Sequence, residues 1–197
     1  MIAVFDMGGV LIRDFSVGPY LVEYLGFPKG TKFREMTPTF GEYLSMHSRG
    51  LITEERMWEL ARNDSPMLKD AKAPLMEKFF HPYLDEPTVS VIERLKAKGV
   101  RVICATNVID SHYRFHVREG QYSIFDKVYP SHLIGLQKPD PEFFRYVLRE
   151  ERTAPEEAFF TDDMEVNVES AKGLGMRAYI YTDASKLEKD LGEVGLL

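Results

Sequence analysis

The chain has 197 residues, of which 44% are hydrophobic and 28% are charged, and its formal net charge is -6 at pH 7. This composition supplies a packed core for one domain, or for one domain with an insertion, and it excludes a disordered chain. The acidic balance argues against a general surface for nucleic acid or anionic membranes.

The cysteine content and the absence of long apolar runs bear on the cell compartment. Cys104 is the one cysteine, so no intramolecular disulfide can form, which fits a reducing environment. No apolar run reaches the roughly 20 residues of a membrane-spanning helix, and the first residues do not resemble a secretory signal. We therefore expect a soluble, cytoplasmic protein.

Strand and helix patterns alternate along most of the chain. Five short runs rich in β-branched and aromatic residues predict buried strands: Ile2 to Phe5, Val100 to Ala105, Lys127 to Tyr129, Ala158 to Thr161 and Arg177 to Tyr181. Helical patterns follow at Glu86 to Lys98, from Asp140-Pro141 onward, at Met164 to Gly173 and at Ser185 to Leu191. Strand–helix alternation predicts an α/β fold with an open parallel sheet.

One stretch, from about residue 15 to about residue 84, contains helical patterns and no convincing strand. The helical patterns are Pro19 to Leu25, Thr39 to His47, a capped start at Thr53, and Pro74 to Phe80. We therefore divide the chain into an α/β core (1–14 and 85–197) and a helical insertion (15–84). The insertion is either a cap over the end of the first strand or an ordinary elaboration of the fold, and periodicity does not choose between them.

Polar residues follow the predicted strands, where ligands bind to open parallel sheets. Asp6 ends the first strand, and its carboxylate suits a metal ligand or a nucleophile that takes up a phosphoryl group. Gly8 and Gly9 allow a sharp turn and a close backbone approach to a ligand. A simple loop-capping role for Asp6 is the alternative.

The second predicted strand ends at Thr106 and Asn107, which form either a phosphate cradle at a helix start or an ordinary helix cap. Lys138 precedes Pro139 and lies at the positive end of the next helix, where an ammonium group does not stabilise the helix. Lys138 therefore either neutralises a carboxylate and a bound phosphate or is a surface lysine.

Two adjacent aspartates, Asp162 and Asp163, follow the fourth predicted strand. Neighbouring carboxylates repel each other unless a cation joins them, and Mg²⁺ prefers hard oxygen ligands of this kind. Asn167 lies about one helical turn further on and is placed to steady the pair or a bound water. The alternative is a helix N-cap, but two consecutive aspartates after an apolar strand favour a metal site.

Together these segments resemble the four motifs of the haloacid dehalogenase-like (HAD) hydrolase superfamily. The similar segments, in motif order, are 4–11, 103–107, 135–143 and 159–176. The resemblance covers essentially the whole chain. It implies a Rossmann-like parallel sheet, and the position of the insertion resembles the subgroup with an α-helical cap after the first motif.

The resemblance also implies roles for the candidate residues in a Mg²⁺-dependent phosphatase. Asp6 would form an aspartyl phosphate, and Lys138 would offset the charge of Asp6 and phosphate. Thr106 and Asn107 would bind the transferring phosphoryl group. Mg²⁺ would be held by Asp6, the backbone carbonyl of Gly8 and Asp163, with Asp162 as a ligand or support and with Asn167 supporting. The substrate would be a small phosphorylated metabolite, without nucleic acid or membrane partners, and the protein a monomer or weak homodimer.

One residue departs from the family pattern. Phosphatases of this family usually have a second aspartate, the general acid, two residues after the nucleophile, and here that residue is Gly8. Asp14, His47 or an ordered water are candidates to replace it. The glycine leaves two alternatives open: a 2-haloacid dehalogenase-type hydrolase, which needs no acid, and a catalytically impaired member that only binds phosphate. The paired aspartates favour the phosphatase over the dehalogenase.

Overall fold

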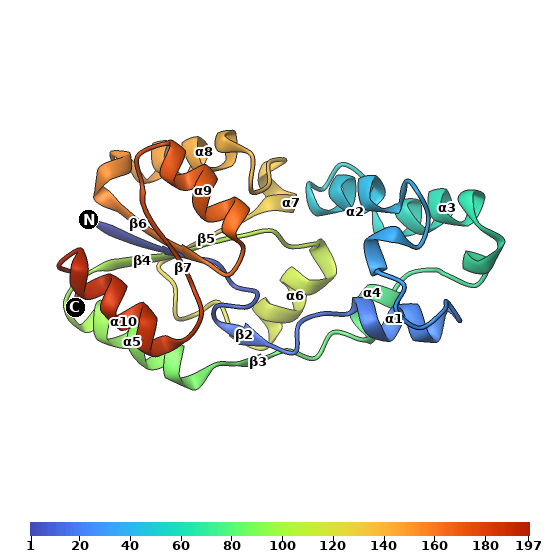
Figure 1. The fold of residues 1–197 in the computed structure, drawn as a ribbon, viewed down its shortest axis with the longest axis horizontal. Helices are drawn as coiled ribbons and strands as arrows, with labels where there is room; N and C mark the ends of the chain where they lie inside the picture. Colours follow the sequence, from blue (N-terminus) through green and yellow to red (C-terminus); the bar gives the residue numbers. More distant parts are fainter.

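The computed structural model describes residues 1–197, and its centre is a five-stranded parallel sheet with the strand order β5-β4-β1-β6-β7 (Figure 1). The strands are β1 (Ile2–Phe5), β4 (Arg101–Thr106), β5 (Lys127–Pro130), β6 (Ala158–Asp162) and β7 (Arg177–Ile180). All five predicted strands are present, with ends that differ by one residue at most. The predicted α/β fold with an open parallel sheet is confirmed.

Residue alternation in the strands explains why both faces of the sheet are covered. Ala3 and Phe5 point into a cluster with the apolar residues of α5 (Glu86–Ala97) and α10 (Ala184–Glu193). Ile2 and Val4 point into a second cluster with α8 (Pro141–Glu151) and α9 (Glu165–Gly173). Successive side chains of a strand face opposite ways, so a continuous apolar strand requires a helical layer on each side.

The remaining helices complete the connections and the helical segment, by which we mean residues 15–84. After the sheet strands come α6 (Asp110–Arg118) and α7 (Ser131–Ile134), with a 3₁₀ turn at Pro155–Glu157. The helical segment contains α1 (Gly18–Tyr24), α2 (Phe40–Ser48), α3 (Glu54–Asp64) and α4 (Leu75–Lys78), with 3₁₀ turns at Phe33–Glu35 and Pro66–Leu68. None of these helices combines the length and hydropathy that crossing a membrane requires.

The helices of this segment lie together at one end of the molecule, beyond the carboxyl ends of the sheet strands (Figure 1). Two short antiparallel strands, β2 (Ile12–Arg13) and β3 (Tyr83–Leu84), pair where the chain enters and leaves the segment. The sequence analysis missed this pair because strands of two residues have no detectable period. The division at 14/15 and 84/85 into separate domains stays a prediction.

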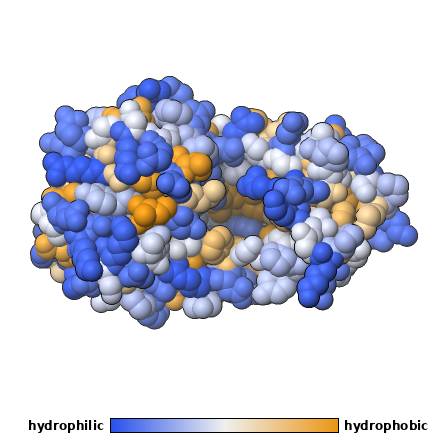
Figure 2. Space-filling model, viewed as in Figure 1, coloured by the Kyte–Doolittle hydropathy of each residue, from blue (hydrophilic) through white to orange (hydrophobic).

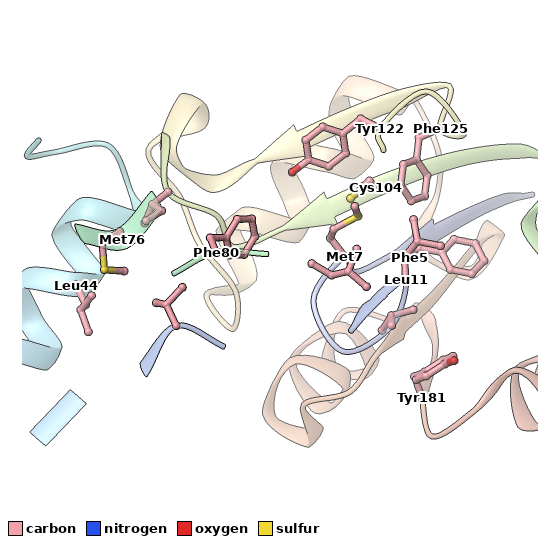
Figure 3. Packing of buried hydrophobic residues seen from close by; sticks show 14 of the residues in the cluster. Phe5, Met7, Leu11, Leu44, Met76, Phe80, Cys104, Tyr122, Phe125 and Tyr181 are labelled. Carbon is pink, nitrogen blue, oxygen red and sulfur yellow. The ribbon is translucent and has the colours of Figure 1, made fainter. Parts of the chain in front are cut away.

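Apolar packing is continuous from the sheet into the helical segment. Leu44 and Met76 come from the segment, Phe80 lies between the two parts, and Met7 and Cys104 lie at the sheet (Figure 3). Burial of such side chains is worth about 1.5–3 kcal/mol each. The helical segment is therefore packed against the sheet edge rather than tethered only by its two connections.

Candidate functional site

A buried lysine brings together two carboxylates from strands that are far apart in the sequence. Lys138 Nζ lies 2.8 Å from Asp6 Oδ1 and 2.5 Å from Asp162 Oδ2, and its side chain is only 1% exposed. Asp6 follows β1 and Asp162 ends β6, and these two strands are neighbours in register. An unpaired ammonium group at this depth would be costly, so the two carboxylates stabilise its charge.

Asp163 joins this group. Carboxylate oxygens of Asp6, Asp162 and Asp163 all lie within 4.8 Å of one another. Burial raises the pKa of Asp6 to about 7, although Lys138 acts in the opposite direction. The pKa of Asp163 is also raised, by burial and by the charge of Asp162. Burial alone would lower the pKa of Lys138, but Asp6 and Asp162 outweigh it and raise that pKa.

The hydrogen bonds of Asp162 distinguish it from the other two aspartates. Its Oδ1 accepts from the backbone N–H of Met164 at 2.8 Å and from Asn167 Nδ2 at 2.9 Å. Its Oδ2 accepts from Lys138 Nζ and, at 3.0 Å, from Asn167. Both oxygens are thus engaged by protein donors. This geometry favours a role for Asp162 in orienting Lys138 rather than in binding a metal. Asn167 in turn orients Asp162.

Asn107 holds the backbone on which Lys138 is carried. Its Nδ2 donates to the carbonyl of Lys138 at 2.8 Å, and the backbone N–H of Lys138 donates to its Oδ1 at 2.8 Å. The side-chain amide therefore positions Lys138, and phosphate binding by Asn107 would fall to its backbone N–H. Thr106, which ends β4, is buried at the same edge of the sheet, since Cys104 pairs with Phe5.

The loop after β1 runs close to Asp163. Gly9 has a left-handed φ of 74°, and a Cβ atom at this position would overlap the carboxylate of Asp163. A Cβ atom at Gly8 would lie 3.1 Å from Cε2 of Phe15, whose ring covers this position. Gly9 thus permits the close approach of the loop to Asp163, whereas Gly8 leaves room for an aromatic ring where the family's acid would be.

The loop is held by a residue that the sequence analysis missed. Arg13 Nη1 donates to the carbonyl of Gly9 at 2.7 Å, and Nη2 donates to the hydroxyl of Tyr181 at 2.9 Å. Arg13 also pairs with Asp85 at 3.4 Å. Arg13, Asp85 and Tyr181 are distant in the sequence, and no spacing or motif connects them, so no sequence signal was available to find this cluster.

The two side chains considered as replacements for the missing acid lie in different surroundings. Asp14 is exposed, has a left-handed φ of 52°, and accepts from Tyr20 at 3.3 Å. His47 is buried in α2, and its Nδ1 lies 3.0 Å from the carbonyl oxygen of Ile52. Neither contacts Asp6 through a hydrogen bond.

The donor set at this edge fits a divalent cation. When all three carboxylates are ionised, they and the one ammonium group carry a net charge of -2, which a divalent cation would neutralise. Asp6 Oδ1 has no hydrogen bond of good geometry despite its burial. Hard oxygen ligands of this kind suit Mg²⁺. Asp163, whose carboxylate is next to Gly9, offers oxygens that Lys138 does not occupy.

Comparison with known proteins agrees with the motifs. Residues 1–175 match the haloacid dehalogenase-like hydrolase family, and the chain belongs to this family. It is 33% identical over 162 residues to the drimenol cyclase drtB of Aspergillus calidoustus, covering 79% of this chain and 30% of that protein. It is 35% identical over 102 residues to the sesquiterpene phosphatase astK of Aspergillus oryzae, covering 51% of this chain and 52% of that protein. The chain thus matches about a third to a half of the length of these relatives.

The fold is also found in solved structures. A HAD family enzyme of Bacteroides thetaiotaomicron, solved in complex with magnesium, superposes with a TM-score of 0.69. The match covers 92% of both chains at 24% sequence identity. At this identity the match shows that the fold is shared.

Proposed function

We propose that this protein hydrolyses small phosphate monoesters with Mg²⁺ and through an aspartyl phosphate on Asp6. The observation that carries the proposal is the single ammonium group of Lys138 between Asp6 and Asp162, with Asp163 beside them. A phosphatase relative and a magnesium complex of a structural neighbour support it.

In the first step a carboxylate oxygen of Asp6 attacks phosphorus, and the bond from phosphorus to the ester oxygen breaks. The electron pair of that bond goes to the leaving oxygen, which then takes a proton. Lys138 favours the ionised form of Asp6 against the effect of burial and orients it, since the pairing with Asp162 holds the ammonium group next to Asp6. Thr106 and the backbone N–H of Asn107 would bind the transferring phosphoryl oxygens.

In the second step water attacks phosphorus, inorganic phosphate leaves, and the Asp6 carboxylate is regenerated. Asp6, the Gly8 carbonyl and Asp163 would hold Mg²⁺, with Asp162 in support. The cation offsets negative charge on the phosphoryl group and on the three carboxylates. Asn107 and Asn167 keep Lys138 and Asp162 in place through both steps. The helical segment would cover the site as a cap and restrict the entry of water.

The leaving oxygen does not receive its proton from residue 8, because glycine has no side chain. General acid–base help is typically worth ~10²–10⁴-fold in rate. We therefore expect esters of acidic alcohols or phenols to be hydrolysed much faster than alkyl esters, which need protonation. Asp14 and an ordered water are the remaining proton sources at this edge, since His47 is held by Ile52.

The test is an assay of sugar, polyol and nucleotide monophosphates with Mg²⁺ and with a chelator. We expect turnover that depends on Mg²⁺ and that Asp6→Asn abolishes, whereas Asp70→Asn, an exposed carboxylate of the helical segment, keeps it. Fluoroberyllate should form an adduct on Asp6 only with Mg²⁺ present. Full activity of Asp6→Asn would refute the mechanism.

The same assay separates the two alternatives. Halide release from 2-chloro acids without a metal would instead show a dehalogenase. Binding of phosphate without turnover of any ester would show an impaired member.

A further inference from the structure

The loop after β1, residues 7–12, is a tight turn that contains Gly8. Its backbone is closed by hydrogen bonds, since the N–H groups of Leu11 and Ile12 both donate to the carbonyl of Met7, at 2.9 and 3.0 Å. Mg²⁺ requires near-ideal octahedral geometry. The Gly8 carbonyl, a metal ligand in the function proposed above, must therefore be held in one orientation.

The Gly8 carbonyl is oriented through the peptide unit that it shares with Gly9. The N–H of Gly9 donates to the carbonyl of Ile12 at 3.2 Å. Because a trans peptide unit is planar, the Gly8 carbonyl points in the opposite direction, away from Ile12. The orientation of the Gly8 carbonyl thus depends on the positions of two groups, the N–H of Gly9 and the carbonyl of Ile12.

Arg13 holds this turn through three carbonyl groups. Its Nη1 donates to the carbonyl of Gly9 at 2.7 Å and to those of Val10 and Ile12 at 3.2 Å. The carbonyls of Gly9 and Val10 accept no backbone N–H. A buried carbonyl without a donor costs about as much free energy as a lost hydrogen bond. One guanidinium group therefore satisfies this turn and contacts both residues of the Gly9–Ile12 hydrogen bond.

The guanidinium group is itself held by three side chains. Nη2 of Arg13 donates to the hydroxyl of Tyr181 at 2.9 Å and lies 3.4 Å from Asp85 Oδ1. Thr88 donates to Asp85 Oδ2 at 2.6 Å, so the Tyr181 hydroxyl, 2.7 Å from Thr88 Oγ1, donates to Thr88. Thr88 and Tyr181 are buried. The direction of the guanidinium group is therefore set by packed side chains rather than by solvent.

The same network reaches the segment that carries Asp162. The backbone N–H of Tyr181 donates to the carbonyl of Asp162 at 2.8 Å, and the backbone N–H of Asp85 donates to the carbonyl of Leu11 at 2.9 Å. Through Tyr181 and Asp85, Arg13 therefore connects the loop after β1 with the end of β6 and the start of α5.

Arg13 and Asp85 also lie where the chain passes between the sheet and the helical segment. β2 ends at Arg13, and Asp85 directly follows β3. Figure 2 shows that the molecular surface is hollowed between these two parts of the molecule. Any displacement of the helical segment reaches the loop through the two connections, and the ion pair of Arg13 with Asp85 joins them.

The charge of Arg13 does not explain its place beside a cation site. A guanidinium group repels Mg²⁺, although Asp85 offsets part of its charge. If Arg13 acted by its charge, its removal would strengthen Mg²⁺ binding. If Arg13 acts by holding the loop, its removal weakens Mg²⁺ binding. The two roles thus predict effects of opposite sign.

We propose that Arg13 is a positioning residue that keeps the loop after β1 in the conformation in which the Gly8 carbonyl binds Mg²⁺. Tyr181 and Asp85 keep Arg13 itself in place. The inference rests on the function proposed above, because that function supplies the cation. Arg13 takes no part in the transfer of the phosphoryl group.

The first test is a titration of the metal-free protein with Mg²⁺, followed by the amide NMR resonances of Gly9 and Asp163. We expect the dissociation constant to rise about 10- to 100-fold in Arg13→Met, the usual range when a partner that orients a metal ligand is lost. Arg13→Lys keeps the charge but not the planar fork of donors, so we expect a rise of similar size. Tyr181→Phe, which changes no charge, should raise the constant about threefold to tenfold. Tighter or unchanged Mg²⁺ binding by Arg13→Met, or full binding by Arg13→Lys, would overturn the inference.

Arg101→Met is the matched control. Arg101 makes two hydrogen bonds to the carboxylate of Glu151, at 2.5 and 3.0 Å, and begins β4, which ends at Thr106. Its ion pair thus lies at the opposite end of the sheet from the site, and its loss should leave Mg²⁺ binding unchanged. Equal weakening of Mg²⁺ binding in Arg101→Met and Arg13→Met would show general destabilisation and would overturn the inference.

Amide hydrogen exchange without Mg²⁺ tests the loop directly. The amide protons that donate within the turn belong to Gly9, Leu11 and Ile12. We expect them to exchange at least about tenfold faster in Arg13→Met than in the wild type or in Arg101→Met. Tyr181→Phe removes only one hydroxyl and supplies the same comparison if Arg13→Met does not fold. Wild-type exchange rates in the folded variant would overturn the inference.

Failure of this inference and failure of the proposed function give different results. If Arg13→Met loses Mg²⁺ affinity but the wild type hydrolyses no ester, the positioning role stands and the phosphatase proposal fails. If the wild type hydrolyses esters with Mg²⁺, and both Arg13→Met and Tyr181→Phe bind Mg²⁺ as the wild type does, the phosphatase proposal stands and the positioning role fails.

Discussion

Placing an aspartate at position 8 should supply the general acid that phosphatases of this family usually have at this position. The backbone of Gly8 is not left-handed, so Asp is allowed there. Its Cβ would lie 3.1 Å from Cε2 and 3.3 Å from Cδ2 of Phe15, so the ring must move by a few tenths of an ångström. Phe15 is 37% exposed and can yield toward solvent. The steric cost of Gly8→Asp is therefore small compared with the catalytic gain.

The gain should depend on the leaving group. General acid help of about 10²-fold, the low end of the usual range, is expected in kcat for alkyl phosphates, whose leaving oxygen needs a proton. Little gain is expected for p-nitrophenyl phosphate, whose leaving group is stable as an anion. Steady-state assays with Mg²⁺ measure both, and Phe15→Ala in the Gly8→Asp background should raise the gain by removing the ring.

Gly8→Asn is the matched control, because it has the same size and cannot donate a carboxyl proton. Equal rates of Gly8→Asp and Gly8→Asn on alkyl phosphates would refute the reasoning. A gain of equal size on both classes of ester would also contradict it, because the benefit would then not be protonation of the leaving oxygen.

Three further changes test the site and its surroundings. Lys138→Met leaves Asp6 and Asp162 without their shared cation. The free energy of unfolding, measured by urea denaturation without Mg²⁺, should therefore fall by about 3–5 kcal/mol. In the double variant with Asp162→Asn, part of that free energy should be recovered, because one of the two unpaired carboxylates is removed. If the losses of the two single variants simply add up in the double variant, the pairing is contradicted. Gly9→Ala should raise the Mg²⁺ concentration needed for half-maximal activity, whereas Gly30→Ala, equally left-handed but with open space around it, should not. Burial lowers the pKa of His112 from 6.5 to about 3, so the unfolded chain binds one more proton between these values. Stability should therefore fall as pH drops through this window, by up to about 1.4 kcal/mol per pH unit, and a His112→Gln variant with the same slope would contradict this.

The sequence by itself was sufficient for the main elements and for the edge of the sheet where the site lies. Apolar runs such as Ile2–Phe5 predict buried strands because both of their faces must be covered, and a polar residue directly after such a run must lie at a strand end. Asp6, Asp162 and Asp163 were found in this way, whereas Lys138 was singled out by its place before Pro139 at the start of a helix. Each of these residues also had an ordinary structural explanation, such as a helix cap or a surface lysine. The catalytic and metal-binding roles therefore came from the family resemblance.

Only the tertiary structure decided how these residues are connected. The apolar pattern before them does not distinguish Asp162 from Asp163, and family resemblance left the role of Asp162 open, but packing turns the first onto Lys138 and Asn167 and the second toward Gly9. Asn107 binds the backbone of Lys138, and Arg13 binds the loop after β1. Contacts of this kind join segments distant along the chain, and their geometry depends on strand order and helix packing. Local residue patterns carry strand and helix periodicity, but they do not carry the distances between elements.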